Sequence, residues 1–134
     1  MKANELMIGD WVIVDEIGCL TPIKVLEVGI NYAVVYDDDS ETMEDYLQPI
    51  PVTAKILEKN GFKSRDNFYE ITFQRNIIYN SIFRIVEFEK SGNWFFGFCD
   101  FPNLIENLRI NYVHELQHAL RLCGLNDLAD NFKI

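Results

Sequence analysis

The chain has 134 residues, which is the size of one domain, or of two very small ones that share a core, and is long enough to bury a hydrophobic core without disulfides. Its 10 Phe, 6 Tyr and 2 Trp residues exclude a disordered chain. Its formal net charge of −9 argues against binding to nucleic-acid backbones, because that binding requires a basic surface.

The first part of the chain predicts short β-strands. Four runs rich in β-branched and aromatic residues are separated by turn residues: Trp11–Val14, Thr21–Val28, Tyr32–Tyr36 and Thr42–Tyr46. Short strands at this spacing predict a small, strongly curved antiparallel sheet, of the Src-homology-3-like or Tudor-like barrel type. Pro49 and Pro51 then end strand pairing, because proline has no N–H to donate. We therefore expect a first subdomain at residues 1–51.

Residues 52–134 predict an α+β subdomain that shares a core with the first. Thr53 is the expected N-cap of a short helix, which Asn60-Gly61 ends in a left-handed C-cap. The turn Ser91-Gly92-Asn93 is typical of a hairpin. The strand-like runs around it are Phe68–Phe73, Ile77–Tyr79, Phe83–Phe88 and Trp94–Cys99. Together they predict an antiparallel β-meander.

Two features of this meander allow more than one interpretation. Leu104–Ile110 matches the spacing of a helix and also that of a final strand. Trp94–Phe98 has apolar residues at both alternating positions, so one face of this strand must be covered by something. The cover is either the chain's own helices or a partner, which would be another protein or a second copy of the chain.

The strongest helical pattern lies near the C-terminal end. Apolar residues recur there at the spacing i, i+3, i+4, i+7, in Tyr112, Val113, Leu116, Ala119, Leu120 and Cys123. Gly124 is typical of a helix end, and a short polar helix is expected at Asn126–Phe132. The amphipathic helix is predicted to cover one face of the meander. At about 100° per residue, His114 and His118 lie opposite the apolar stripe and should face solvent, or whatever covers that side.

These two histidines, the only ones in the chain, form a His-Glu-x-x-His motif. On a helix, this motif is the signature of zinc peptidases: His114 and His118 would bind zinc, and Glu115 would be the general base. A catalytic zinc needs three protein ligands, and the only carboxylates after His118 belong to Asp127 and Asp130. The motif therefore predicts a minimal zinc-dependent hydrolase only if one of these two aspartates is the third ligand.

Three short motifs in the same order resemble one protein family. They are Met1-Lys2-Ala3-Asn4-Glu5-Leu6 with Ile8-Gly9-Asp10-Trp11-Val12, then Pro49-Ile50-Pro51-Val52-Thr53 running to Gly61-Phe62, and Tyr112-Val113-His114-x-Leu116-Gln117. They are similar to a family of small uncharacterised proteins from Bacteroides-type genomes, phages and mobile elements, with the C-terminal signature Lys-Tyr-Val-His-Gln-Leu-Gln-Asn-Leu-Tyr. In that family, glutamine usually occupies the position of Glu115, and asparagine that of His118. The resemblance implies that the zinc motif is a local departure rather than an inherited active site, and it implies no activity.

The cysteines and the N-terminal residues bear on the compartment. Cys19, Cys99 and Cys123 are odd in number and widely spaced, so they predict neither a disulfide framework nor a Cys-x-x-Cys metal site. The first ten residues lack the long apolar run of a signal peptide, and no apolar run is long enough to span a membrane. The sequence predicts an acidic, cytoplasmic protein.

These patterns favour a non-catalytic binding or accessory protein, derived from a mobile element as the resemblance implies. No phosphate-binding glycine loop or nucleophile elbow is present. We expect no cofactor, no membrane and no nucleic-acid backbone as partner; the expected partner is a protein or a second copy on the aromatic face. The alternative is the zinc hydrolase, which Arg121 opposes because its positive charge lies one turn from His118. A nucleic-acid mimic is a third interpretation, based on the acidic charge alone.

Overall fold

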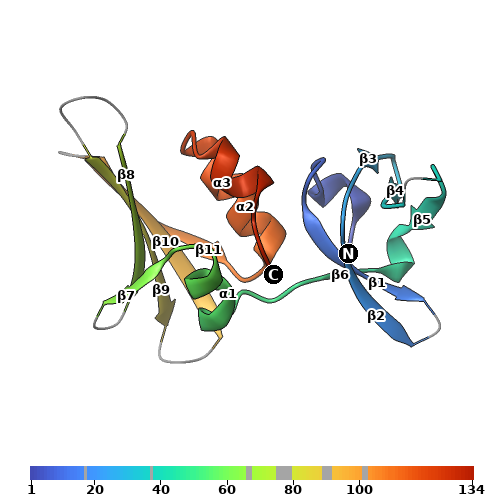
Figure 1. Cartoon of the computed structure of the whole chain (residues 1–134), viewed down its shortest axis with the longest axis horizontal. Coiled ribbons are helices and arrows are strands. Elements are labelled where there is room, and N and C mark those ends of the chain that lie inside the picture. Colours follow the sequence, from blue (N-terminus) through green and yellow to red (C-terminus); the bar gives the residue numbers. More distant parts are fainter. Residues whose placement is uncertain (17, 37, 66–67, 75–79, 89–91, 101–102) are drawn as a thin grey trace. The chain divides into compact units, whose positions relative to one another are not determined.

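The computed structural model describes residues 1–16, 18–36, 38–65, 68–74, 80–88, 92–100 and 103–134. These residues form a mixed α+β protein with three antiparallel sheets and three α-helices (Figure 1). Its contacts divide it into two compact units: Met1–Pro51 with Tyr112–Phe132, and Val52–Asn111 with Lys133–Ile134. The α+β class expected from the sequence is confirmed.

The first unit contains two small antiparallel sheets. One has the strand order β2-β1-β6 and is made of β1 (Trp11–Glu16), β2 (Cys19–Lys24) and β6 (Leu47–Pro49). The other has the order β3-β4-β5 and is made of β3 (Glu27–Val28), β4 (Tyr32–Val34) and β5 (Glu41–Met43). Two 3-10 turns, η1 (Ala3–Glu5) and η2 (Glu44–Tyr46), precede β1 and β6. Among the described residues no pairing joins the two sheets into a closed barrel, so the barrel remains a prediction.

The core of the first unit follows from the alternation of side chains along β1. Val12 and Val14 are buried, whereas Trp11 and Ile13, which alternate with them along the strand, are only half-buried. This is expected for a strand with one face on a core. The buried residues of this cluster come from the chain before β1, from both sheets and from the connections that follow β2 and β4: Leu6, Val12, Val14, Val25, Ala33, Val35 and Leu47.

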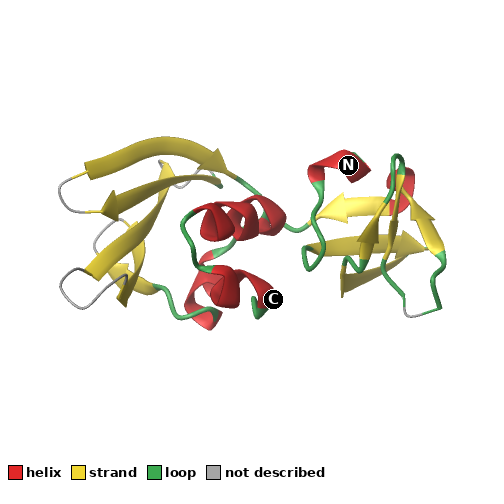
Figure 2. Ribbon diagram, turned by 90° about the horizontal axis from the view of Figure 1, so that it is seen from above, coloured by secondary structure: helices red, strands yellow, loops and turns green. Residues whose placement is uncertain are grey.

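The second unit contains one five-stranded antiparallel sheet, strongly twisted in Figure 2. Its order is β11-β10-β9-β8-β7, with β7 (Lys63–Arg65), β8 (Phe68–Gln74), β9 (Asn80–Phe88), β10 (Asn93–Asp100) and β11 (Asn103–Ile110). The expected meander is therefore present. Leu104–Ile110, which matched both helix and strand, is a strand because it pairs along β10. The expected strand Ile77–Tyr79 and residue Ser91 of the expected turn lie outside the described residues.

The aromatic run of β10 is only partly described. Trp94 is 3% exposed and donates its indole N–H to the Val52 carbonyl at 3.0 Å, so this side chain is buried and its polar group is paired. Phe95 is half-buried, and the side chains of Phe96 and Phe98 lie outside the described ones. A partner on this face remains a prediction.

The short helix α1 (Ala54–Lys59) begins and ends as its sequence predicts. The Thr53 hydroxyl accepts a hydrogen bond from the Ile56 N–H at 3.2 Å, which satisfies one of the free N–H groups of the first turn. Gly61 has a φ of +85°, and the Phe62 N–H donates to the Leu57 carbonyl at 3.1 Å. This geometry is that of a glycine C-cap.

The C-terminal helices are α2 (Val113–Leu122) and α3 (Asn126–Asp130). Gly124, with a φ of +80°, ends α2, and the Leu125 N–H donates to the Leu120 carbonyl at 2.8 Å. Contacts group both helices with Met1–Pro51, whereas the sequence had placed them in the 52–134 subdomain. Cover of the meander by α2 remains a prediction. No helix in the described part of the chain is both long and apolar enough to cross a bilayer.

One buried side chain, Gln117, joins α2 to the rest of the first unit. Its Oε1 accepts from the Trp11 N–H at 2.9 Å. Its Nε2 donates to the carbonyls of Gly9 and Ala129, both at 2.9 Å. Gln117 is fully buried, so these backbone groups and the amide satisfy one another away from water. The polar side of α2 at Gln117 is therefore packed against other parts of the unit, which is the second of the two surroundings expected for that side.

The variant Gln117→Ala should lower the free energy of unfolding by about 3 kcal/mol, because three backbone groups lose their partner in the interior. Urea denaturation measures this change. Gln48→Ala is the matched control, since the amide of Gln48 donates once, to Asp15 at 3.0 Å, and its loss should cost about 1 kcal/mol. Equal losses in the two variants would contradict the role of Gln117.

Candidate functional site

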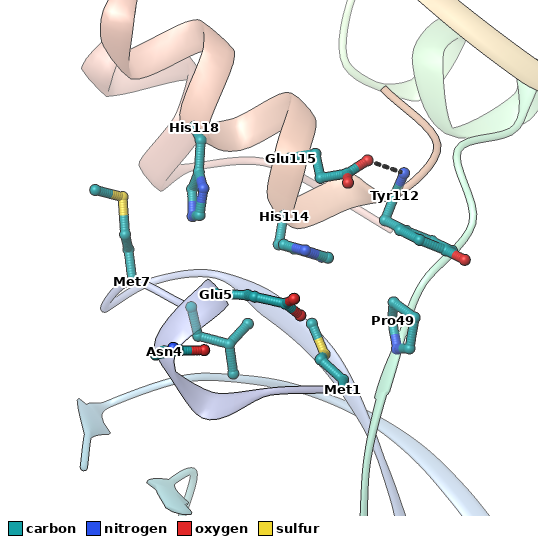
Figure 3. A pocket seen from close by; sticks show the side chains of 10 residues that line it. Met1, Asn4, Glu5, Met7, Pro49, Tyr112, His114, Glu115 and His118 are labelled. Atoms are coloured by element: carbon teal, nitrogen blue, oxygen red, sulfur yellow. Dashed lines mark hydrogen bonds between the residues drawn. The ribbon is translucent and has the colours of Figure 1, made fainter. Parts of the chain in front are cut away.

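A cavity of about 730 Å³ lies in the first unit beside the first turns of α2 (Figure 3). It is lined by the N-terminal segment, the end of β6 and the start of α2, through Met1, Asn4, Glu5, Leu6, Met7, Pro49, Tyr112, His114, Glu115 and His118. Figure 3 shows both histidines pointing from α2 toward the segment that carries Glu5 and Met7. The volume of the cavity is within the range of small-molecule sites, about 300–1,000 Å³.

His114 is a buried side chain, only 5% exposed. Its ring stacks on Tyr112, with 5.9 Å between centroids and 8° between planes. Its Nδ1 is buried and has no hydrogen-bond partner in the described part of the chain. Burial lowers the pKa of His114 below its ordinary value of 6.5, although the nearby carboxylates of Asp10 and Glu115 act in the opposite direction. The imidazole is therefore neutral at pH 7. Of the two surroundings expected for His114, solvent or a covering element, the structure shows the covering element.

His118 is held by a buried carboxylate. Its Nε2 lies 2.6 Å from Oδ2 of Asp10, a residue with no exposed surface. The same carboxylate accepts from the Met7 N–H at 2.8 Å and from Nη1 of Arg121 at 2.7 Å. A buried carboxylate is tolerated when a cation offsets its charge and hydrogen bonds satisfy its oxygens, and Asp10 meets both conditions.

Glu115 caps the helix that carries it. Its carboxylate accepts from the Tyr112 N–H at 3.1 Å, which satisfies a free N–H group at the start of α2. Glu115 lies on the wall of the cavity together with His114 and His118, so the structure brings the whole His-Glu-x-x-His motif to one place. The helical spacing of the motif predicted that these side chains are neighbours.

The two candidate third ligands lie elsewhere. The Asp130 carboxylate accepts from Nη2 of Arg121 at 3.3 Å, and its side chain is 62% exposed. Asp127 is an exposed residue in the first turn of α3. Neither belongs to the lining of the cavity. In the described ranges, no three His, Cys, Asp or Glu side chains are grouped so that they could hold a metal ion.

The sequence indicated no role for Asp10, which appeared only within the motif Ile8-Gly9-Asp10-Trp11-Val12. Asp10 and His118 are 108 positions apart, and no local pattern connects them. It also gave no role to Glu5 and Met7, which line the cavity from the N-terminal segment. Arg121 was noted only as a charge that opposes a metal, whereas it is the cation that offsets Asp10.

We expect Asp10→Asn to lower the free energy of unfolding by about 3 kcal/mol, because it leaves the Arg121 charge without its buried partner. Thermal or urea denaturation measures the loss. Asp15→Asn on β1 is the control, since the Asp15 carboxylate accepts from the Gln48 amide near the surface, and its loss should cost under about 1 kcal/mol. A loss at Asp10 no larger than that at Asp15 would contradict the geometry.

The lowered pKa of His114 predicts a loss of stability in acid. The unfolded chain binds a proton near pH 6.5, and folded His114 binds it only at lower pH. The free energy of unfolding should therefore fall as the pH drops from 6.5 toward the folded pKa, and this effect should be absent above 6.5. Denaturation of wild type and of His114→Gln across this range measures it, and the variant should lack this part of the pH dependence.

Proton NMR gives an independent check, because the chain has only two histidines and their ring signals are easily assigned with His114→Gln. The His114 signals should titrate below pH 6.5. Titration of His114 at or above that value would mean that its ring is not buried in solution.

The comparisons with known proteins supply no function for the cavity. Comparison of the chain with protein families, with curated proteins and with solved structures found no match. A function for this chain therefore has to follow from the cavity, from the contacts of His114, Glu115 and His118, and from the charges around them.

Proposed function

We propose that the protein is a non-catalytic binding module whose ligand site is the cavity at the start of α2. One observation carries this proposal: the residues of the zinc motif line a cavity of small-molecule size while two of them make structural contacts. Such a wall suits recognition, because its side chains are already oriented by the fold.

The contacts of Glu115 and His118 favour binding over hydrolysis. A general base has to accept a proton from a bound water, whereas the Glu115 carboxylate caps the helix. Zinc ligation through Nε2 of His118 would have to displace the Asp10 carboxylate, which Arg121 and the Met7 N–H also hold. The roles of Glu115 and His118 in the zinc mechanism thus compete with contacts that stabilise the fold.

The zinc-dependent hydrolase is the second candidate, because His114 and His118 line the same cavity, with 5.9 Å between their ring centroids. It would use Glu115 as base, and Asp127 or Asp130 as third ligand after a rearrangement of α3. The charge of Arg121 next to His118 does not oppose a cation there, because the Asp10 carboxylate offsets it.

The wider proposal concerns the origin and the architecture of the protein. The three motifs that resemble the Bacteroides-type family support an accessory protein derived from a mobile element. The short strands of the first unit support a Src-homology-3-like or Tudor-like barrel, and the amphipathic pattern of α2 supports a cover for the meander. The aromatic run Trp94–Phe98 supports a protein partner or self-association.

Metal analysis tests the binding module against the hydrolase. Protein purified without a histidine tag should contain far less than one zinc per chain, and added zinc should not raise its melting temperature, because the described side chains offer no third ligand. The variants His114→Gln and His118→Asn should give the same result. Zinc at one per chain, lost in His118→Asn, would establish the hydrolase site instead.

A further inference from the structure

We propose that the cavity binds a small organic cation with a flat apolar body, such as a protonated aromatic amine. This inference rests on the proposed binding function and names the chemical class of the ligand. It follows from the charges on the wall, from the flat aromatic surface and from the unsatisfied nitrogen of His114.

The charges on the wall favour a cation. The ten described lining residues include Glu5 and Glu115 but no lysine or arginine. His114 is kept neutral by its burial, and the Arg121 charge is used by Asp10. The α-ammonium of Met1 donates to the neutral Leu47 carbonyl and so keeps its one positive charge on the wall, against the two carboxylates. At the position of His114, the carboxylates of Asp10, Glu115 and Glu5 favour positive charge, whereas burial and His118 oppose it. The excess of carboxylates on the wall favours a cationic ligand.

The apolar part of the wall favours a flat ring. The Tyr112 and His114 rings are parallel within 8°, with 5.9 Å between their centroids, so their faces have the same orientation. The other apolar lining comes from side chains that adapt to a ring edge or pack on its face: Met1, Leu6, Met7 and Pro49. Aromatic rings stack on such surfaces, and a cation attached to the ring gains further attraction from the face of Tyr112.

The unpaired nitrogen of His114 indicates a hydrogen-bond donor in the ligand. A buried polar atom without a partner is unfavourable, and Nδ1 of His114 is such an atom. An ammonium group carries only donors; the Glu5 carboxylate accepts, and Nδ1 of a neutral imidazole accepts when the ring proton is on Nε2. Because Nδ1 is covered, the imidazole has to turn for this nitrogen to meet a donor. Ligand binding should therefore change the environment of the His114 ring.

Three indoles that differ in charge test the inference: tryptamine is a cation at pH 7, indole is neutral and indole-3-acetate is an anion. Binding is followed by NMR through the ring signals of the two histidines, at low salt and with millimolar ligand. Tryptamine should bind about tenfold more tightly than indole-3-acetate, as expected for one attractive charge contact. Indole should lie between them, and the His114 signals should shift the most.

Charge-neutral variants separate the local effect from the overall acidity of the chain. Glu5→Gln retains the shape of the side chain. It should lower the affinity for tryptamine several-fold and leave the affinity for indole unchanged, because only the cation is attracted by the carboxylate. Glu58→Gln, at an exposed position of α1 in the second unit, removes one charge elsewhere and should change neither affinity.

The outcomes distinguish the two proposals. If indole-3-acetate binds at His114 as tightly as tryptamine, the inferred preference for a cation is wrong, whereas the proposed binding function is not affected. If Glu5→Gln and Glu58→Gln lower the affinity for tryptamine equally, the inferred cation site is also wrong, since the effect would come from the overall charge of the chain. If none of the three indoles shifts the NMR signals of His114, the inferred cationic ligand is wrong, and so is the proposal that the cavity is the ligand site.

Discussion

The first unit depends on two buried polar side chains that join distant parts of the chain. Asp10 accepts hydrogen bonds from Met7 and Arg121 and contacts His118, while Gln117 bonds the backbone around β1 and α3. Neither side chain can reach water, so each is tolerated only when all of its partners are in place. This requirement fixes the position and rotation of α2 against the N-terminal segment more narrowly than apolar packing alone would.

The same constraint produces the cavity and changes the meaning of the zinc motif. Helical spacing puts His114 and His118 on one side of α2, as in a zinc peptidase. Here the N-terminal segment covers that side: Asp10 holds His118, and burial keeps His114 neutral. A motif defined by spacing specifies which side chains are neighbours, whereas the elements packed against them decide their protonation and their partners.

Much of the secondary structure was predictable because its signals are local. Thr53 and Gly61 mark the two ends of α1 through a cap bond and a left-handed backbone. Gly124 ends α2 in the same way. Strands with one buried face were also recognised, since their alternation is visible in the sequence. Leu104–Ile110 lacked such a signal, and its pairing along β10 made it a strand.

The sequence by itself determined the α+β class, the helix ends and the presence of His114, Glu115 and His118 on one helix side, because each depends on residues a few positions apart. Only the tertiary structure decided what that side does. The partners of His118 and Gln117 on the N-terminal segment lie more than a hundred positions away. Burial, and with it the charge of His114, depends on that contact, and helical periodicity carries no information about which distant segment supplies it.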